Sequence, residues 1–102
     1  IFYLIKHEKN AWIHFFATFA IILLAFIFKI NSYEWLFISL AICLVWITEL
    51  INTAIEVIVN LVQPDIHPLA KTIKDLAAGA VLTSAFFSLL VAFFIFIPKI
   101  FK

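Results

Sequence analysis

The feature that most constrains the fold of this chain is an unbroken run of 22 uncharged residues at 76–97. As an α-helix, such a run is about 33 Å long, close to the roughly 30 Å hydrocarbon core of a bilayer. Soluble domains are about 45–50% apolar and about 25% charged, whereas this chain is 67% hydrophobic and 13% charged. A domain of 102 residues cannot bury that much apolar surface from water. Lipid is therefore the predicted solvent.

Two further segments are predicted to cross the membrane as helices. Residues 11–28 carry no charge, and residues 35–47 begin a second apolar helix whose pattern continues to Gln63. Pro64 ends that helix, and Pro68 suits the first turn of a third one. We therefore predict an all-α membrane protein, a single domain over residues 1–102, with transmembrane helices at 11–29, 35–63 and 68–97.

Composition and charge exclude some classes of protein. Cys43 is the single cysteine, which excludes a disulfide framework, and the net charge of +1 gives no nucleic-acid footprint. The basic residues are all lysines, and Lys6, Lys9, Lys71 and Lys74 outnumber the three at the other membrane face. The positive-inside rule then places the loop before Lys71 in the cytoplasm.

A polar stripe interrupts the second predicted span. Glu49, Asn52, Glu56 and Asn60 follow one another at intervals of three, four and four residues. At 3.6 residues per turn, these side chains share one helix face. Acidic groups at such depth are costly unless they face protein, water or a cation. The stripe is therefore a candidate functional site.

A second polar stripe, formed by Lys71, Lys74 and Asp75, opens the third predicted helix. The tight loop at 64–68 should fold the two stripes toward each other. The acidic segment before the first span is expected at the same membrane face. The predicted cluster contains Glu8, Glu49, Asn52, Glu56, Lys74 and Asp75, with His67 on the loop above it.

This cluster contains the groups needed for phosphoryl transfer. Mg²⁺ prefers one or two carboxylates together with substrate phosphates, and lysine meets phosphate as a point charge. Phosphoryl transfer mostly requires positioning, charge neutralisation and a base that orients the hydroxyl. The residues are therefore consistent with a kinase that acts on a membrane alcohol.

Other interpretations remain open from the residues alone. The stripe could be structural, or it could relay ions or protons in a small transporter subunit, and the chain could also be a non-catalytic assembly subunit. A relay needs polar groups across the whole membrane, whereas residues 35–47 and 76–97 are uncharged. His14, inside the first span, is interpreted as a packing or hydrogen-bonding side chain. Because three helices bury such a stripe poorly, we expect a homo-oligomer.

Three segments resemble the prokaryotic diacylglycerol kinase family, which includes undecaprenol kinases. They are HEKNAWIH at 7–14, ELINTAIEVIVN at 49–60 and HPLAKTIKDLAAGAVL at 67–82. The resemblance implies a homotrimer of three-span subunits in the bacterial inner (cytoplasmic) membrane. It also implies an N-terminal amphipathic surface helix, of which residues 1–10 would be the last part. Its active sites would lie between subunits at the cytoplasmic face and use ATP and Mg²⁺ to phosphorylate diacylglycerol or undecaprenol.

The resemblance also implies roles for individual residues. Glu49 matches the proposed general base, Asn52 supports it, and Lys74 with Asp75 matches a pair at the nucleotide. The resemblance implies that Glu8 and Glu56 bind the metal ion. The residues implied to contact the nucleotide are Glu8, Glu56, Asp65, Ile66, His67, Lys74 and Asp75.

The chain departs from the family pattern at two positions. Asn60 stands where Asp is usual, which removes one charge near the nucleotide entrance, and Trp12 stands where many relatives have Arg. The spelling of the HPLAK and NTAIE segments is nearer to the undecaprenol kinase branch than to the enterobacterial diacylglycerol kinases.

Overall fold

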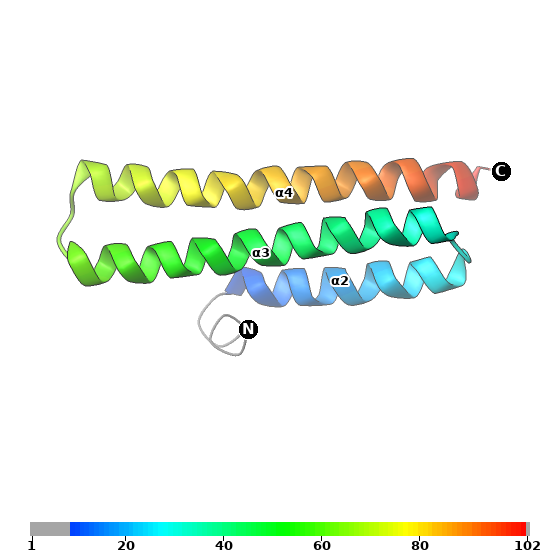
Figure 1. Cartoon of the computed structure of the whole chain (residues 1–102), viewed down its shortest axis with the longest axis horizontal. Helices are drawn as coiled ribbons and strands as arrows, with labels where there is room; N and C mark the ends of the chain where they lie inside the picture. Colours follow the sequence, from blue (N-terminus) through cyan, green and yellow to red (C-terminus); the bar gives the residue numbers. More distant parts are fainter. Residues whose placement is uncertain (1–8, 102) are drawn as a thin grey trace.

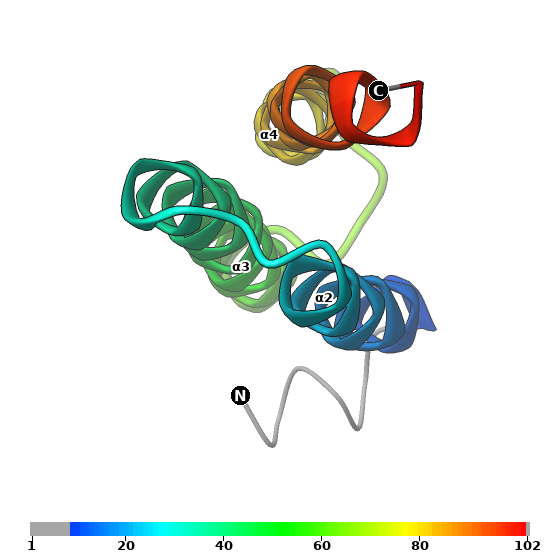
Figure 2. The same cartoon turned by 90° about the vertical axis from the view of Figure 1, so that its right-hand side faces the viewer.

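The computed structural model describes residues 9–101, which form three antiparallel helices. They are α2 (Lys9–Ile27), α3 (Ser32–Val62) and α4 (Pro68–Ile100), lying side by side along the long axis of the molecule (Figure 1). Helix α3 packs against both α4 and α2, and in the end-on view the three helices lie at the corners of a triangle (Figure 2). The predicted all-α architecture is confirmed for these residues.

Helix α2 ends in a Schellman motif centred on Lys29. The backbone N–H of Lys29 donates to the carbonyl of Phe26 at 3.3 Å, and that of Ile30 donates to the carbonyl of Ala25 at 3.2 Å. This geometry requires a left-handed residue, and Lys29 has φ of 51°. Ala25 and Ile30 are both buried at this corner. The helix therefore ends at Ile27, two residues before the predicted limit.

Helix α3 begins with a capping box. The Asn31 side chain accepts from the Glu34 N–H at 2.9 Å, while the Glu34 carboxylate accepts from the Asn31 N–H at 3.0 Å. These bonds satisfy backbone donors that a helix start leaves free, so the helix begins at Ser32 rather than at the predicted Trp35. Glu34 also pairs with Lys99 near the end of α4, at 3.0 Å.

Helix α4 begins as predicted and ends later than predicted. Pro68 occupies the first turn, and the His67 imidazole caps it by accepting from the Leu69 N–H at 3.1 Å. The helix continues through Pro98 to Ile100, three residues beyond the predicted transmembrane span. Pro98 has no backbone N–H to donate to the carbonyl of Phe94, and only two helical residues follow it, so the interruption affects only the end of the helix.

The apolar core lies at the end of the bundle that holds the α2–α3 turn. Its buried members are Ala25, Ile30, Ile38, Ile95 and Phe96. Further along, the Ser88 hydroxyl of α4 donates to the Ala41 carbonyl of α3 at 3.2 Å. The core therefore secures one end of α3 and α4, while the polar residues gather toward the other end.

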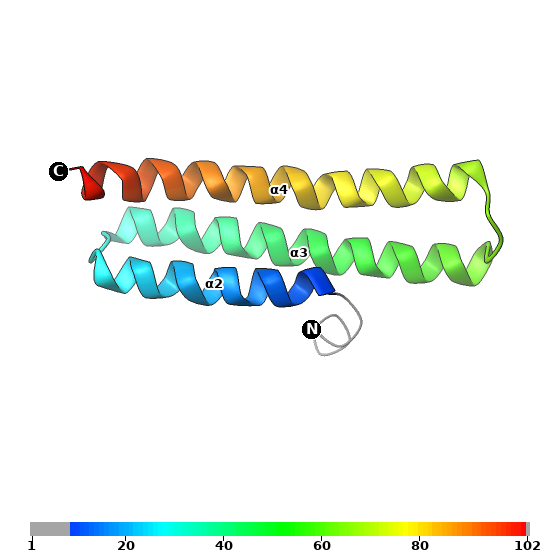
Figure 3. The same ribbon diagram turned by 180° about the vertical axis from the view of Figure 1, so that it is seen from behind.

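Two of the helices are long and apolar enough to span a membrane, namely α3 and α4. Only 33% and 28% of their most apolar segments are buried within the chain, whereas a core helix of a soluble protein would be mostly covered. The apolar part of α2, Ala11–Ile27, is shorter. The whole of α2 nevertheless lies beside α3, along the part of α3 nearer its N-terminus (Figure 3). The described residues thus fit a helical membrane protein with two long apolar helices.

The Lys29 conformation gives a prediction about stability. A side chain in the left-handed region costs about 1–2 kcal/mol relative to glycine, so Lys29→Gly should raise the free energy of unfolding by about 1 kcal/mol. Thermal unfolding of the detergent-solubilised protein measures the change. Lys29→Ala is the control, because it removes the charge but keeps Cβ. Equal melting temperatures for the Gly and Ala variants would contradict the prediction.

Candidate functional site

The polar stripe on α3 changes from buried to exposed along its length. Glu49 is 2% exposed and Asn52 is 7% exposed, whereas Glu56 is half-buried and Asn60 is exposed. From Glu49 to Asn60 the helix rises about 16 Å. The stripe contacts different helices along its length: Glu49 contacts α2, whereas Asn60 contacts α4. The stripe therefore connects a buried carboxylate to the loop end of the bundle.

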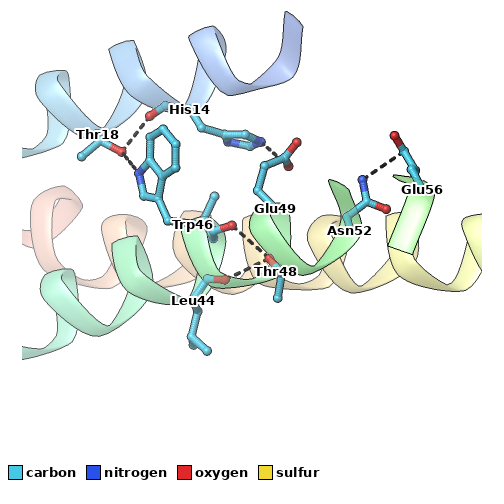
Figure 4. Close-up of polar contacts among 9 residues, drawn as sticks. His14, Thr18, Leu44, Trp46, Thr48, Glu49, Asn52 and Glu56 are labelled. Carbon is cyan, nitrogen blue, oxygen red and sulfur yellow. Dashed lines mark hydrogen bonds and ion pairs between the residues drawn. The ribbon is translucent and has the colours of Figure 1, made fainter. Parts of the chain in front are cut away.

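The buried carboxylate of Glu49 meets a histidine from α2. The Nε2 atom of His14 lies 3.5 Å from Oε2 of Glu49 (Figure 4). One turn further along α2, Thr18 accepts from the Trp46 indole N–H at 3.0 Å and donates to the His14 carbonyl at 2.7 Å. In the described residues, these two contacts are the polar side-chain links between α2 and α3. They fix the register of the two helices beside Glu49.

Asn52 and Glu56 form the second contact along the stripe. The Asn52 amide N–H donates to Oε1 of Glu56 at 3.3 Å (Figure 4). The Oδ1 atom of Asn52 and the hydroxyl of Thr53 are buried without a hydrogen-bond partner in the described part of the chain. Buried polar atoms are nearly always satisfied, so the unpaired Asn52 oxygen indicates a place for a further partner.

The stripes of α3 and α4 meet through Lys74. Its Nζ donates to Oδ1 of Asn60 at 2.6 Å, which agrees with the prediction that the loop folds the two stripes together. Asp75, the neighbour of Lys74, instead pairs with Lys71 one turn earlier, at 2.9 Å. Both members of that second pair are exposed. Lys74 therefore contacts a neutral amide, while the charge of Asp75 is balanced by Lys71.

A pocket of about 290 Å³ lies at the loop between α3 and α4. Five of the residues predicted to contact nucleotide line it, together with Asn60: they are Asp65, Ile66, His67, Lys74 and Asp75. Ile66 is fully exposed, and the His67 ring caps α4 through Nδ1. The structure thus brings the loop and the predicted lysine–aspartate pair to one pocket.

The remaining predicted site residues do not join this pocket. Glu49, Asn52 and Glu56 lie farther along α3 and are absent from its lining. Glu8, predicted to bind metal with Glu56, lies outside the described residues. Within residues 9–101 there is no group of three or more His, Cys, Asp or Glu side chains that could hold a metal ion. One chain therefore presents the site in separate parts.

The partner of His14 is a residue that the sequence pattern does not identify. The pattern predicts a packing or hydrogen-bonding side chain at His14, and the structure supplies Glu49 as its partner. A signal was present, because an ionisable residue inside an apolar run requires a polar partner. The choice among the carboxylates depends on the register of α2 against α3, which the sequence pattern does not specify.

The chain is similar to known proteins over nearly its whole length. The model of the family described as prokaryotic diacylglycerol kinase matches residues 1–96. The undecaprenol kinase of Bacillus subtilis (strain 168) is 40% identical over 95 residues, covering 93% of this chain and 77% of that protein. The diacylglycerol kinase of Synechocystis sp. is 37% identical over 99 residues, covering 96% of this chain and 57% of that protein.

A third relative is the diacylglycerol kinase of Helicobacter pylori (strain ATCC 700392 / 26695), 37% identical over 95 residues, which cover 85% of this chain and 73% of that protein. No solved structure matches the chain with statistical significance. Since the family model covers nearly the whole chain and the relatives are lipid kinases by name, this chain belongs to the prokaryotic diacylglycerol kinase family, whose members are phosphotransferases with an alcohol acceptor.

Proposed function

We propose that the chain is an ATP-dependent kinase that phosphorylates the hydroxyl of a membrane lipid alcohol at the cytoplasmic face of a bacterial inner membrane. The observation that carries the proposal is a carboxylate, Glu49, buried at 2% exposure within a long apolar helix. A buried base beside lipid is placed to meet a hydroxyl that never leaves the bilayer. An apolar cavity of about 230 Å³ is lined by His14, the residue that contacts the Glu49 carboxylate.

Glu49 is proposed as the general base. It accepts or orients the hydroxyl proton while the lipid oxygen attacks the γ-phosphate of ATP in line, and ADP leaves. Asn52 supports the site three residues further along α3. The sequence contains a single glycine, so a glycine-rich phosphate loop cannot be formed. Side chains must therefore hold the phosphates.

The loop pocket is the proposed place of the nucleotide. Among the described residues 9–101, the polar partner of Lys74 is the neutral amide of Asn60, so its charge remains available to the phosphates of ATP. The loop residues Asp65, Ile66 and His67 and the carboxylate of Asp75 form the rest of the proposed nucleotide contacts. Lys74 would offset negative charge as it develops during transfer.

The residues fit Mg²⁺. Hard oxygen ligands suit this ion, and the buried Oδ1 of Asn52 lacks a partner next to the Glu56 carboxylate. Glu56 and Glu8 would hold the ion. When bound, Mg²⁺ neutralises phosphate charge on the nucleotide. The Asn52 amide N–H already orients the Glu56 carboxylate for this role.

A homotrimer would complete the site and its membrane part. The polar contacts of one chain are spread over about 16 Å of α3, and much of the apolar surface of all three helices is exposed. Neighbouring copies would cover that surface and bring the base and nucleotide residues of different subunits together, with α2 as a third span. The mass of the detergent-solubilised complex tests this. A fully active monomer would exclude shared sites.

A transporter subunit is the alternative function, with Glu49 and Glu56 as a relay. The distribution of polar groups disfavours it, because the half of α3 before Glu49 buries mainly apolar side chains. Flux measurements in liposomes, compared with phosphate transfer from ATP labelled at the γ position, distinguish the two functions. Flux without transfer would favour the transporter.

The base role predicts the behaviour of Glu49→Gln. The substitution keeps the shape of the side chain but removes its ability to take a proton, so we expect kcat to fall by about 10²–10⁴-fold. Transfer of labelled phosphate to lipid in mixed micelles measures kcat. Size-exclusion chromatography controls for an intact assembly. A correctly assembled variant that retains wild-type turnover would dismiss the role.

The metal role predicts a change in Mg²⁺ dependence. Glu56→Gln and Glu8→Gln should each raise the Mg²⁺ concentration for half-maximal activity by about tenfold, because a carboxylate ligand is lost. Glu34→Gln is the matched control, since Glu34 pairs with Lys99 at the opposite end of α3. Unchanged Mg²⁺ dependence in either site variant removes that residue from the metal site.

The acceptor lipid is tested by direct competition. Purified protein is given undecaprenol and diacylglycerol in the same mixed micelles, and the labelled products are separated. We expect faster transfer to undecaprenol, because the relative with 40% identity and 77% coverage of its length is an undecaprenol kinase. Faster transfer to diacylglycerol would reverse this assignment while leaving the lipid kinase proposal intact.

A further inference from the structure

The contact between His14 and Glu49 belongs to a matched pair of links between two antiparallel helices. His14 and Thr18 are four residues apart on α2, and their partners Glu49 and Trp46 are three residues apart on α3. Both spacings are about one helical turn. Figure 4 shows the two side chains of α2 directed at α3. The His14–Glu49 contact is therefore one of two separate polar links between these helices, and the Thr18–Trp46 link lies one turn away from it.

The surroundings of Glu49 give its carboxylate few other partners. Asn52, the next polar residue of the stripe, donates to Glu56 instead. Within residues 9–101, His14 is the sole side chain whose polar atom is within 4 Å of the Glu49 carboxylate as an ion-pair or hydrogen-bond partner. A buried carboxylate without a donor would be costly and poorly oriented. The imidazole is placed to meet both needs.

We propose that His14 is a positioning residue for Glu49, and that its Nε2–H orients the carboxylate for the lipid hydroxyl; the proposal rests on the base role proposed above. By occupying Oε2, the imidazole leaves Oε1 of Glu49 free to accept from the substrate. The 3.5 Å separation is long for a hydrogen bond. Such contacts at active sites often shorten only when substrate is bound.

The placement of His14 also relates the base to the acceptor. His14 lines the apolar cavity between the three helices, along with small side chains such as Ala17, Ala41 and Ala85. One ring thus borders both the carboxylate and an apolar space. A lipid hydroxyl that approaches along this wall meets the carboxylate oxygen that His14 leaves free.

The test compares two substitutions at His14 in the full-length protein. His14→Leu replaces the donor by an apolar side chain of similar size, so kcat should fall by about 10–100-fold, as expected when a catalytic group loses its orientation. The KM for ATP should change by less than about twofold, since the nucleotide pocket lies elsewhere on the molecule. His14→Gln, whose amide can donate near the position of Nε2, should recover kcat to within about fivefold of the wild type.

Thr18→Val is the matched control. It removes the other link between α2 and α3 while leaving the Glu49 contact in place, and we expect kcat within about twofold of the wild type. A loss equal to that of His14→Leu would show that helix docking alone is responsible and would overturn the proposal. Wild-type kcat in His14→Leu, or a Gln variant as impaired as the Leu variant, would overturn it too. A wild-type protein without any phosphate transfer overturns the proposed function and this inference together.

Discussion

Burial of one carboxylate in an apolar helix is the constraint on which the rest of this structure depends. Glu49 is 2% exposed on a helix otherwise suited to lipid, and a lone charge there would cost several kcal/mol. The chain offsets that cost with a polar contact from α2. This contact requires α2 to lie antiparallel to α3 in one register, which the Thr18–Trp46 hydrogen bond reinforces. The packing of α2 therefore follows from the placement of Glu49 as much as from its own apolar side chains.

Burial also divides the polar residues of α3 into a buried group around Glu49 and an exposed group at the loop end. At the Glu49 end the polar groups are buried and few, which is consistent with the proposed role of Glu49 as proton acceptor for a lipid hydroxyl. At the loop end, Asn60 and Lys74 are in contact beside an open pocket, which suits a charged and hydrated nucleotide. Asn52 and Glu56 lie between the two ends. Exposure thus increases along a single helix. An apolar acceptor would meet the buried polar groups at one end, and a polar phosphate donor would meet the exposed groups at the other.

Much of this arrangement could be predicted from the sequence, because it depends on local pattern. Uncharged runs and the prolines at 64 and 68 locate the helices, and a spacing of three and four residues places the stripe on one face. The helix ends were less predictable. Lys29 adopts a conformation usually reserved for glycine, and Pro98 lies inside the final turn of α4. The partner of His14 depends on tertiary register, and the role predicted for Glu8 falls outside the described residues.

The two lysines at the start of α4 have different electrostatic surroundings, because only one of them pairs with a carboxylate. Lys71 lies one turn before Asp75 and pairs with it at 2.9 Å, so their charges cancel at an exposed surface where such a pair adds little stability. Lys74 instead reaches across to the neutral Oδ1 of Asn60. An aspartate at position 60 would neutralise Lys74, whereas the amide holds the ammonium in place and preserves its full charge. The departure from the family pattern at Asn60 therefore favours attraction of an anionic ligand to Lys74 at the loop pocket.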